Sequence, residues 1–500
     1  MLRNYILLPK RGVRSRTDAQ PVKDFFNLLN TKRYVPRAMS LKPRSVLENK
    51  MPIQIQVLDS LHDDGAKLVE VNEAEIAELR MSYPGMRIVP EVFFQKALAP
   101  RRPVTIKPAS ATRAQTKYTI TILSAVDEPL EKVEINLFSN YKTGEGATAV
   151  TNRNGVAVFH LPPLLNIERL NIYPPHSHWP RRVLKPVFKK NELVIKLSGI
   201  DPSFSGILNH FYPVHQRTLI SPKIKIGIID TGVGPHKYIP VKGGANFVLS
   251  EDLADYFDNG DGHGTHVAGI IGGMGEGGAA GFRGLAPGAT LYSYRVFGAH
   301  GEDASSFAIM KAIDRAVHDG CDLVNLSLGS ADEDSGIAES IIEAYNKGVV
   351  CFAATGNAFR EAVSFPASAQ FSIAVSAFGR KKTWPDGSLQ ADMIKSPYGA
   401  DNQNFIASFS NIGEQVDLTA PGVAITSGHP GDLFSVLDGT SMACPAATAI
   451  AARLLNAAPA IYQMPRNSAR ANEIVKLVSA HAGSLGFDTH FEGKGLLGHL

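Results

Sequence analysis

The last 280 residues of the chain alternate near-continuous apolar stretches with helical patterns, and this alternation limits the fold more than any other feature. The apolar stretches lie at residues 224–229, 290–297, 323–328 and 349–354, and the helical patterns at 305–319 and 336–347. Strands that lack polar alternation are buried on both faces, which is typical of a parallel sheet covered by helices on both sides. We therefore predict an α/β fold for residues 205–500.

Two smaller units precede this sheet. Residues 1–99 mix short strands with helical patterns, one of which begins at Asn72, and indicate an α+β unit. Residues 100–116 have the composition of a linker. In residues 117–198 hydrophobic side chains recur with a period of two, and Asn154-Gly155 predicts a hairpin turn, so we expect an all-β sandwich. Its strand pattern resembles the carboxypeptidase-regulatory-like sandwiches.

Charge is unevenly distributed along the chain. The net charge of +4 divides into +13 for residues 1–200 and −9 for residues 201–500. The basic residues are scattered among strand patterns and no nucleic-acid-binding motif accompanies them, so we expect no nucleic-acid partner and an attraction between the two halves. No apolar stretch reaches the roughly 18 residues of a membrane span, and no export signal is recognisable. We expect a cytoplasmic protein, or one exported by a route without a recognisable signal peptide.

Four polar residues stand where apolar strands end or where helices of small residues begin. Asp230 and Asn357 follow strands, whereas His263 and Ser441 begin helices. Because the carboxyl ends of parallel strands meet at one edge of a sheet, we expect these four side chains to lie close together. A hydroxyl at the start of a helix, with a histidine, an aspartate and an amide donor nearby, has the chemistry that acyl transfer needs.

The sequences around these residues resemble those of the subtilisin-like serine peptidases. Asp230, His263 and Ser441 follow one another in the family's order, with a Thr-Gly-Asn sequence at Asn357 and a Gly-Leu-Ala-Pro turn at 284–287. The resemblance implies that Ser441 is the nucleophile, His263 the general base and then acid, and Asp230 the residue that orients the histidine. Asn357 would form the oxyanion hole with the backbone N–H of Ser441.

The same resemblance implies where a polypeptide substrate binds. The two walls of the primary specificity pocket would be made by Ser327, Leu328, Gly329, Ala354 and Gly356. Residues 364–369 would form its floor, and none of these residues is acidic. We therefore expect endopeptidase activity with an apolar or medium-sized side chain before the cleaved bond, and pairing of an extended peptide with the backbone of Gly329.

Residues 1–99 resemble the inhibitor-like propeptide of the same family, through residues 65–71, the helix that follows and residues 86–91. This resemblance implies a self-inhibited zymogen, in which the N-terminal unit acts as an intramolecular inhibitor until it is removed by autoprocessing. We expect the extended residues 93–99 to lie in the cleft and the cut to fall between Phe94 and Arg102, with Leu98 and Ala99 as the preferred positions before the cut.

Metal binding has two candidates in the sequence. Asp252, Asp255, Asp258 and Asp261 are spaced closely enough to suggest calcium, although solvated loop acids are the commoner explanation for such a cluster. His263 and His266 lack the spacing and the glutamate of a zinc-peptidase helix. We expect no catalytic metal and no cofactor, and a calcium site is not identifiable. An insertion at about 380–404 is predicted to be a surface loop.

Two other functions compete with this hypothesis. A scaffold protein could keep the fold without activity, but the four intact polar positions argue against it. An esterase of the α/β-hydrolase type would need a Gly-x-Ser-x-Gly sequence and a different order of catalytic residues, and the chain has neither.

Overall fold

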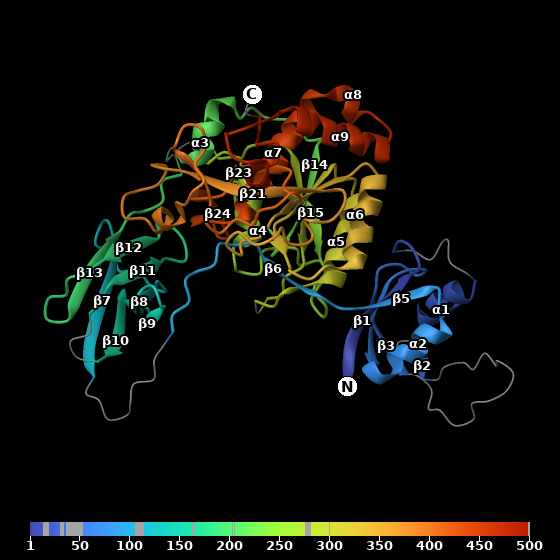
Figure 1. The fold of residues 1–500 in the computed structure, drawn as a ribbon, viewed down its shortest axis with the longest axis horizontal. Coiled ribbons are helices and arrows are strands. Elements are labelled where there is room, and N and C mark those ends of the chain that lie inside the picture. Colours follow the sequence, from blue (N-terminus) through green and yellow to red (C-terminus); the bar gives the residue numbers. More distant parts are fainter. Residues whose placement is uncertain are drawn as a thin grey trace.

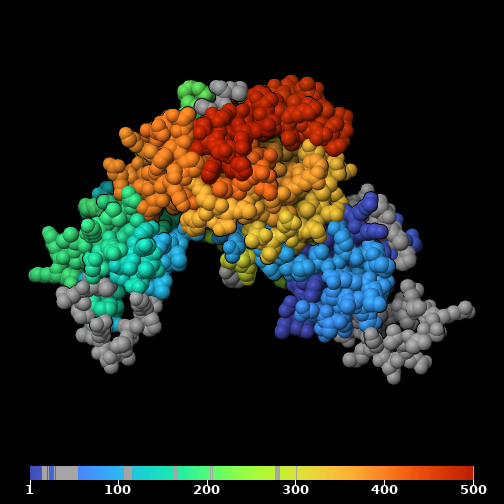
Figure 2. All heavy atoms as spheres, viewed as in Figure 1, coloured from blue at the N-terminus to red at the C-terminus, as the bar shows by residue number. Residues whose placement is uncertain are grey.

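The computed structural model describes residues 1–13, 20–30, 35–36, 54–105, 115–162, 166–202, 204, 206–275, 282–299 and 301–498. We call residues 1–99 the N-terminal unit, 116–197 the sandwich and 206–498 the large unit. The large unit lies in the middle, and the two smaller units contact it at opposite ends (Figure 1). Figure 2 shows that the two smaller units are separated from each other on this view.

The N-terminal unit is an antiparallel sheet in the order β2-β3-β4-β1-β5 with two helices. Its elements are β1 (Leu2–Pro9), α1 (Gln20–Asn30), β2 (Val35–Pro36), β3 (Gln54–Ser60), β4 (Lys67–Asn72), the short 3₁₀ helix η2 (Glu73–Glu75), α2 (Ile76–Ser82) and β5 (Met86–Pro90). Tyr5 and Leu7 pack with the unit's own helices, whereas Ile6 and Leu8 join a core shared with the large unit. Both faces of β1 are therefore buried, which explains why its sequence is continuously apolar.

The sandwich consists of a three-stranded sheet, β10-β7-β13, and a four-stranded sheet, β12-β11-β8-β9, around one apolar core. Its strands are β7 (Thr116–Ser124), β8 (Glu134–Asn140), β9 (Glu145–Val150), β10 (Val156–Leu161), β11 (Arg169–Tyr173), β12 (Arg181–Leu184) and β13 (Glu192–Leu197). The predicted hairpin at Asn154-Gly155 is wrong, because this turn joins β9 and β10, which belong to different sheets. The turn itself is present, with Gly155 at a φ of 72°.

The large unit contains a mainly parallel sheet in the order β15-β16-β14-β18-β20-β21-β23-β27-β26, with β22 beside β21. Only β22 and β26 pair antiparallel with their neighbours. The strands are β14 (Lys225–Asp230), β15 (Val241–Asn246), β16 (Thr290–Arg295), β18 (Leu323–Leu326), β20 (Val350–Ala354), β21 (Ser372–Arg380), β22 (Asn404–Ile406), β23 (Leu418–Pro421), β26 (Ala482–Gly483) and β27 (Leu496–Leu497).

Helices cover both faces of this sheet, which confirms the predicted fold class. The helices α4 (His263–Gly272) and α7 (Thr440–Ala457) share one apolar core, and α5 (Ser306–His318) and α6 (Ser335–Asn346) share the other. The large unit also contains α3 (Ile207–Phe211), η3 (Val214–Gln216), η5 (Leu389–Met393), α8 (Pro459–Tyr462), α9 (Ser468–Ala480), α10 (Thr489–Glu492), and the hairpin of β24 (Ile425–His429) and β25 (Leu433–Leu437). None of the helices in the described ranges is long and apolar enough to cross a membrane.

The N-terminal unit docks on α5 and α6. The side chain of Val13 is buried in their shared core, and its N–H donates to Glu343 over 2.9 Å. Arg87 pairs with Glu339 at 3.1 Å, whereas Lys311 of the large unit pairs with Asp59 at 2.7 Å. Each unit thus contributes a cation to one of these ion pairs and an anion to the other. The opposite net charges of the two halves therefore do not describe the individual contacts at this interface.

The insertion at 380–404 contacts the sandwich, a role that the sequence did not reveal. Asp392 in η5 forms ion pairs with Arg169 and Arg182 of the sandwich, and the N–H of Arg182 donates to the carbonyl of Gly387 over 2.8 Å. On the other side of the same contact, the N–H of Ser177 donates to the carbonyl of Phe434 over 2.7 Å. The insertion is therefore a docking element rather than a free surface loop.

Candidate active site

The four polar residues singled out in the sequence lie at the carboxyl edge of the main sheet. Asp230 is the last residue of β14, and Asn357 follows β20 by three residues. His263 is the first residue of α4, and Ser441 lies in the first turn of α7. Because α4 and α7 pack on the same face, the strand ends and helix starts bring all four side chains to one edge.

Asp230 and His263 form a buried pair. The Nδ1 of His263 is 2.6 Å from the Oδ1 of Asp230, and both side chains are at most 1% exposed. The same carboxylate oxygen accepts the N–H of Thr231 over 2.7 Å. A carboxylate at Nδ1 holds the proton there, so Nε2 becomes the basic nitrogen. In the described part of the chain Nε2 has no hydrogen-bond partner, so it is free to accept a proton from a hydroxyl that turns towards it.

Asp258 holds the start of α4 in place, a role that differs from the calcium ligand or loop acid suggested by the sequence. Its Oδ1 accepts the N–H groups of Gly260 and Gly262, each over 2.9 Å, and its Oδ2 accepts the Oγ1 hydroxyl of Thr265 over 2.7 Å. Gly262 adopts a φ of 87°, which favours glycine. Asp258 thereby satisfies free donors at the beginning of the helix and positions His263 beside Asp230.

Ser441 and Ser327 are joined by two hydrogen bonds, and a third bond from Asn325 holds Ser327. The Ser441 hydroxyl donates to the carbonyl of Ser327 over 2.9 Å. Pro445 cannot donate an N–H to the carbonyl of Ser441 within the helix, and the hydroxyl of Ser327 donates to that carbonyl instead, over 3.0 Å. The hydroxyl of Ser327 in turn accepts from Asn325 over 2.9 Å. The helix start and one wall of the cleft are thus fixed to each other.

The side-chain amide of Asn357 provides a free hydrogen-bond donor at the same edge of the sheet. Its Oδ1 accepts the N–H of Thr440 over 2.9 Å, which fixes the orientation of the amide. Its Nδ2 is buried and has no hydrogen-bond partner among the described residues. A buried, unpaired donor is costly, so its retention points to a ligand atom that it receives during function.

A segment of the same chain lies across this edge. The strand β6 (Phe93–Lys96) pairs antiparallel with β17 (Ala304–Ser305) on one side and with β19 (Leu328–Gly329) on the other. The cleft is thus closed by a central strand whose direction and register are set by backbone hydrogen bonds. In Figure 1 this strand runs from the N-terminal unit along the underside of the large unit.

The peptide bond between Ala97 and Leu98 lies at Ser441. The carbonyl of Ala97 accepts the N–H of Ser441 over 3.1 Å, and the N–H of Ala97 donates to the carbonyl of Ser327 over 3.2 Å. One residue beyond, the N–H of Ala99 donates to the carbonyl of Asp438 over 2.8 Å. A Cβ atom on Gly439 would lie 2.6 Å from the carbonyl oxygen of Ala97, so only glycine lets the segment approach this closely.

Side chains anchor the segment before this bond. Phe94 is fully buried, with its ring centroid 6.0 Å from that of Phe365. Lys96 forms an ion pair with Asp261, and the backbone of Val92 exchanges hydrogen bonds with Ser306. The bond presented to Ser441 is one residue N-terminal to the first of the two predicted cleavage positions.

Asp438 supports the far side of the cleft from a half-buried position. Its side chain accepts the N–H of Ala424 over 2.7 Å and the Nε2 of Gln390 over 2.8 Å, while its carbonyl holds Ala99. Burial raises the pKa of Asp438 from 3.8 to about 6. Above that pH a charged carboxylate is enclosed beneath the bound segment, which disfavours the folded state.

Replacing Asp438 with asparagine should therefore change stability in a pH-dependent way. Because the folded pKa is raised, the penalty is absent below about pH 4, grows up to about pH 6 and is constant above it. The free energy of unfolding of Asp438→Asn, relative to that of the parent, should be about 2–3 kcal/mol higher at pH 8 than at pH 4. The check is thermal unfolding at both pH values in a Ser441→Ala background, which prevents self-digestion. An equal difference in melting temperature at both pH values would contradict it.

The other residues proposed to bind substrate fall into two groups. Ser327, Leu328 and Gly329 contact the segment through its backbone, as described above. Ala354 ends β20, and the N–H of Gly356 donates to Thr440 over 3.1 Å. A Cβ on Gly356 would lie 2.3 Å from the hydroxyl of Ser364. The wall formed by Ala354 and Gly356 therefore lies directly against residues 364–369, the predicted floor of the pocket. The sequence missed Asp258, Asp438 and Gln390, of which only Asp258 carried a signal, as an aspartate just before a helix.

Other candidate residues have ordinary structural roles. His266 is fully buried, its Nε2 lies 3.0 Å from the carbonyl of Ile425, and burial lowers its pKa to about 3, so it stays neutral. The three cysteines are buried and unpaired. Asp255 pairs with Arg295 at 3.1 Å. Within the described ranges no three histidine, cysteine or acidic residues are placed to hold a metal ion.

Comparison with known proteins assigns the large unit. The model of the subtilase family matches residues 221–491, more than half of the chain. The chain belongs to the subtilase family. Subtilisin BL of Lederbergia lenta is 35% identical over 231 residues, which make up 46% of this subtilase and 76% of that protein. Subtilisin DY of Bacillus licheniformis is 33% identical over 279 residues, or 55% and 88% of the two chains. M-protease of Shouchella clausii is 34% identical over 238 residues, or 48% and 55%.

Family membership confirms the predicted activity and fold. This subtilase is a serine endopeptidase that acts through an Asp-His-Ser triad, and its α/β sheet is the one expected of the family. The family match begins at residue 221, so the N-terminal unit and the sandwich lie outside it.

Proposed function

We propose that Ser441, His263 and Asp230 are the triad and that Asn357 completes the oxyanion hole. The observation that carries this assignment is the carbonyl of Ala97, which accepts the N–H of Ser441 while its chain is held in register between β17 and β19. A peptide carbonyl on one oxyanion donor, with an unpaired amide donor on Asn357, has the arrangement that acyl transfer needs.

The reaction follows from these positions. The Ser441 hydroxyl turns from the carbonyl of Ser327 to the Nε2 of His263, which takes its proton as Oγ attacks the carbonyl carbon. Asp230 stabilises the imidazolium, and the N–H of Ser441 and the Nδ2 of Asn357 stabilise the oxyanion. His263 then gives the proton to the leaving amine as the C–N bond breaks, and water releases the acyl group by the same steps in reverse.

We infer further that the N-terminal unit inhibits the enzyme until it is cleaved. Its last strand fills the cleft, and the unit is tied to α5 and α6 by a shared apolar core, so a second polypeptide has no access. The small side chain of Ala97 at Ser441 supports a preference for apolar or modest residues before the cleaved bond. Calcium dependence is not part of this proposal, since no ligand set identifies a site among the described residues.

Replacing Asn357 with alanine should lower kcat by about 10²- to 10³-fold while KM changes little, because its amide acts only on the oxyanion of the transition state. Asn357→Asp is the second variant, since it keeps an acceptor for the N–H of Thr440 but replaces the donor with a carboxylate that repels the oxyanion. In peptide hydrolysis assays Asn357→Asp should lose at least as much activity as Asn357→Ala. Full activity in Asn357→Asp would refute the role of the amide.

A further inference from the structure

The chain beyond the bond at Ser441 lies between the large unit and the sandwich. Residues 98–103 line a cavity of about 460 Å³ together with the loop at 435–438, the insertion, the sandwich strand β11 and the loops that follow β8 and β11. Thr105 then pairs with the outer edge of β9, where its N–H donates to the carbonyl of Gly144 over 2.7 Å. The sandwich therefore forms a wall of the cleft on the leaving-group side.

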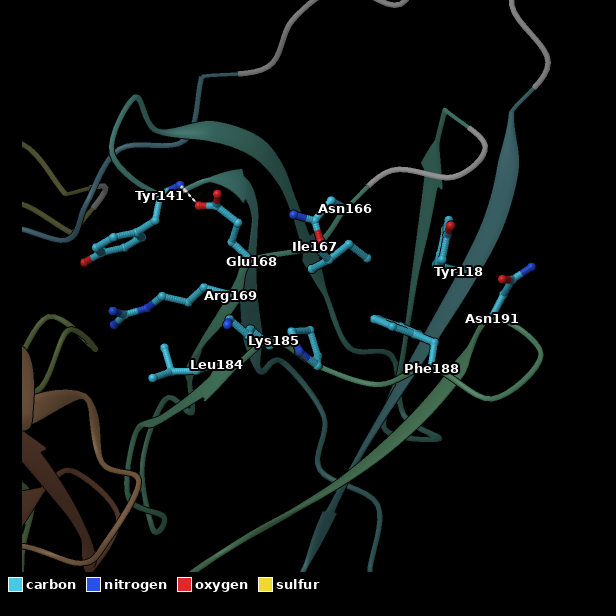
Figure 3. A pocket seen from close by; sticks show the side chains of 11 residues that line it. Tyr118, Tyr141, Asn166, Ile167, Glu168, Arg169, Leu184, Lys185, Phe188 and Asn191 are labelled. Atoms are coloured by element: carbon cyan, nitrogen blue, oxygen red, sulfur yellow. Dashed lines mark hydrogen bonds between the residues drawn. The ribbon is translucent and has the colours of Figure 1, made fainter.

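This wall is held rigidly enough to act as a binding surface. The ion pairs of Asp392 with Arg169 and Arg182 join it to the insertion, and the guanidinium of Arg169 is buried. The guanidinium of Arg169 also lies 4.1 Å from the centroid of the Tyr141 ring. The backbone N–H of Tyr141 donates to the carboxylate of Glu168 over 2.8 Å. Figure 3 shows Tyr141 and Arg169 extending side by side from the sandwich, with the hydrogen bond to Glu168 drawn.

Two arginines of the bound segment contact this wall. The guanidinium of Arg101 lies 4.3 Å over the ring of Tyr173 and 2.7 Å from a carboxylate oxygen of Glu134. The guanidinium of Arg102 lies 4.9 Å from the ring of Tyr141 and donates to the carbonyl of Lys142. An aromatic face with a carboxylate at its edge is a site for a planar cation.

We propose that the sandwich selects polypeptide substrates that carry basic residues, arginine above all, four and five residues after the cleaved bond. Counting from the bond after Ala97, Arg101 and Arg102 occupy these two positions. The fourth position dominates, because it combines a ring with a carboxylate, whereas Tyr141 at the fifth is already shared with Arg169. The proposal rests on the cleavage function above, and it extends the substrate site from the catalytic unit to the sandwich.

The carboxylate at the fourth position agrees with this proposal. Arg169 and Arg182 share the single carboxylate of Asp392, which offsets one of their two charges. Among the described residues the side chain of Glu134 has only Arg101 and the amide of Asn136 as partners. The enzyme's own segment stays attached to the sandwich after the cut, and when it detaches from this wall, Glu134 and Tyr173 are exposed to a cation from another chain. The backbone edge of β9 is freed at the same time and can pair with that chain.

The test compares internally quenched peptides that share Phe-Gln-Lys-Ala before the bond and Leu-Ala-Pro after it. They differ only in the next two residues, which are Arg-Arg, Lys-Lys, Ala-Ala or Glu-Glu. The enzyme is expressed as the full chain with Arg101→Ala and Arg102→Ala and is used after it has been processed. Its own segment then lacks the two arginines that would compete with the peptides for the sandwich. The kcat/KM of the Arg-Arg peptide should exceed that of the Ala-Ala peptide about threefold to thirtyfold, as expected for one exposed cation–π contact and one exposed ion pair.

Variants of the sandwich residues then show whether the preference for arginine arises at this wall. Tyr173→Ala and Glu134→Gln should reduce the Arg-Arg to Ala-Ala ratio towards one, Tyr173→Phe should keep most of it, and Glu192→Gln on the opposite sheet should keep all of it. Equal kcat/KM values for all four peptides would overturn the proposal while leaving the peptidase assignment intact. Failure to cleave any of the peptides would instead count against the proposed triad and cleft.

Discussion

Replacing Ser441 or His263 with alanine is expected to lower kcat by about 10⁶-fold. The expectation follows from the structure, since the N–H of Ser441 donates to the bound carbonyl and the Nε2 of His263, at the same sheet edge, has no partner among the described residues. In a subtilisin, a relative of this enzyme, loss of the serine or the histidine costs a factor of about 2 × 10⁶ in kcat. The measurement is hydrolysis of a peptide by the processed enzyme at saturating substrate.

Two further variants sharpen this test. The double variant Ser441→Ala/His263→Ala should be no less active than either single variant, because the two residues act as one unit. Ser468→Ala, at the start of α9 and away from the cleft, should retain normal activity. A serine-directed fluorophosphonate should label the Ser468→Ala enzyme and leave Ser441→Ala unlabelled. Activity of Ser441→Ala within tenfold of the parent would disprove the assignment.

The wild-type chain should cut itself between Ala97 and Leu98 and lose about a fifth of its 53.8 kDa, whereas Ser441→Ala should remain whole. Intact mass measurement and sequencing of the new N-terminus check both expectations. Ala97→Asp should slow the cut at least about a hundredfold, because the pocket offers no partner for a buried carboxylate, and several kcal/mol separate it from alanine. Met81→Asp, which is exposed on the same unit, should be processed normally.

Two outcomes would contradict this scheme. A wild-type enzyme that is fully active with Met1 still attached would show that the segment does not block the cleft. A new N-terminus at Ala99 or Pro100, as the sequence suggested, would show that the register of β6 differs from the one described here.

The triad could be predicted from the sequence because each of its members carries a local signal. Asp230 and Asn357 end apolar strands and His263 and Ser441 begin helices, and parallel topology alone brings such positions together. The cleavage position could not be predicted with the same precision. Ala97, Leu98 and Ala99 are all small or apolar, and only the pairing of β6 with β17 and β19, which are more than 200 residues away, decides which one reaches Ser441.

The roles of the insertion and of the turn at Asn154-Gly155 could not be predicted either, because they depend on contacts between residues far apart in the sequence. Asp392 meets Arg169 and Arg182 across more than 200 residues, so nothing local marks the insertion as a docking element. The turn at Asn154-Gly155 has the residues of a hairpin, but the sandwich core separates its two strands into different sheets. Turn chemistry determines the local bend, whereas burial determines which strands pair.

The cleft-bound segment is held on both sides of the bond that is cut, so cutting and release are separate events. After hydrolysis, Ala97 still ends a strand paired with β17 and β19, and the N-terminal unit is still buried against α5 and α6. Leu98 and Ala99 remain attached to the sandwich through the same chain. The nicked enzyme therefore stays occupied until the fragment dissociates, and the duration of inhibition is set by an off-rate, and ultimately by the stability of that interface, rather than by catalysis.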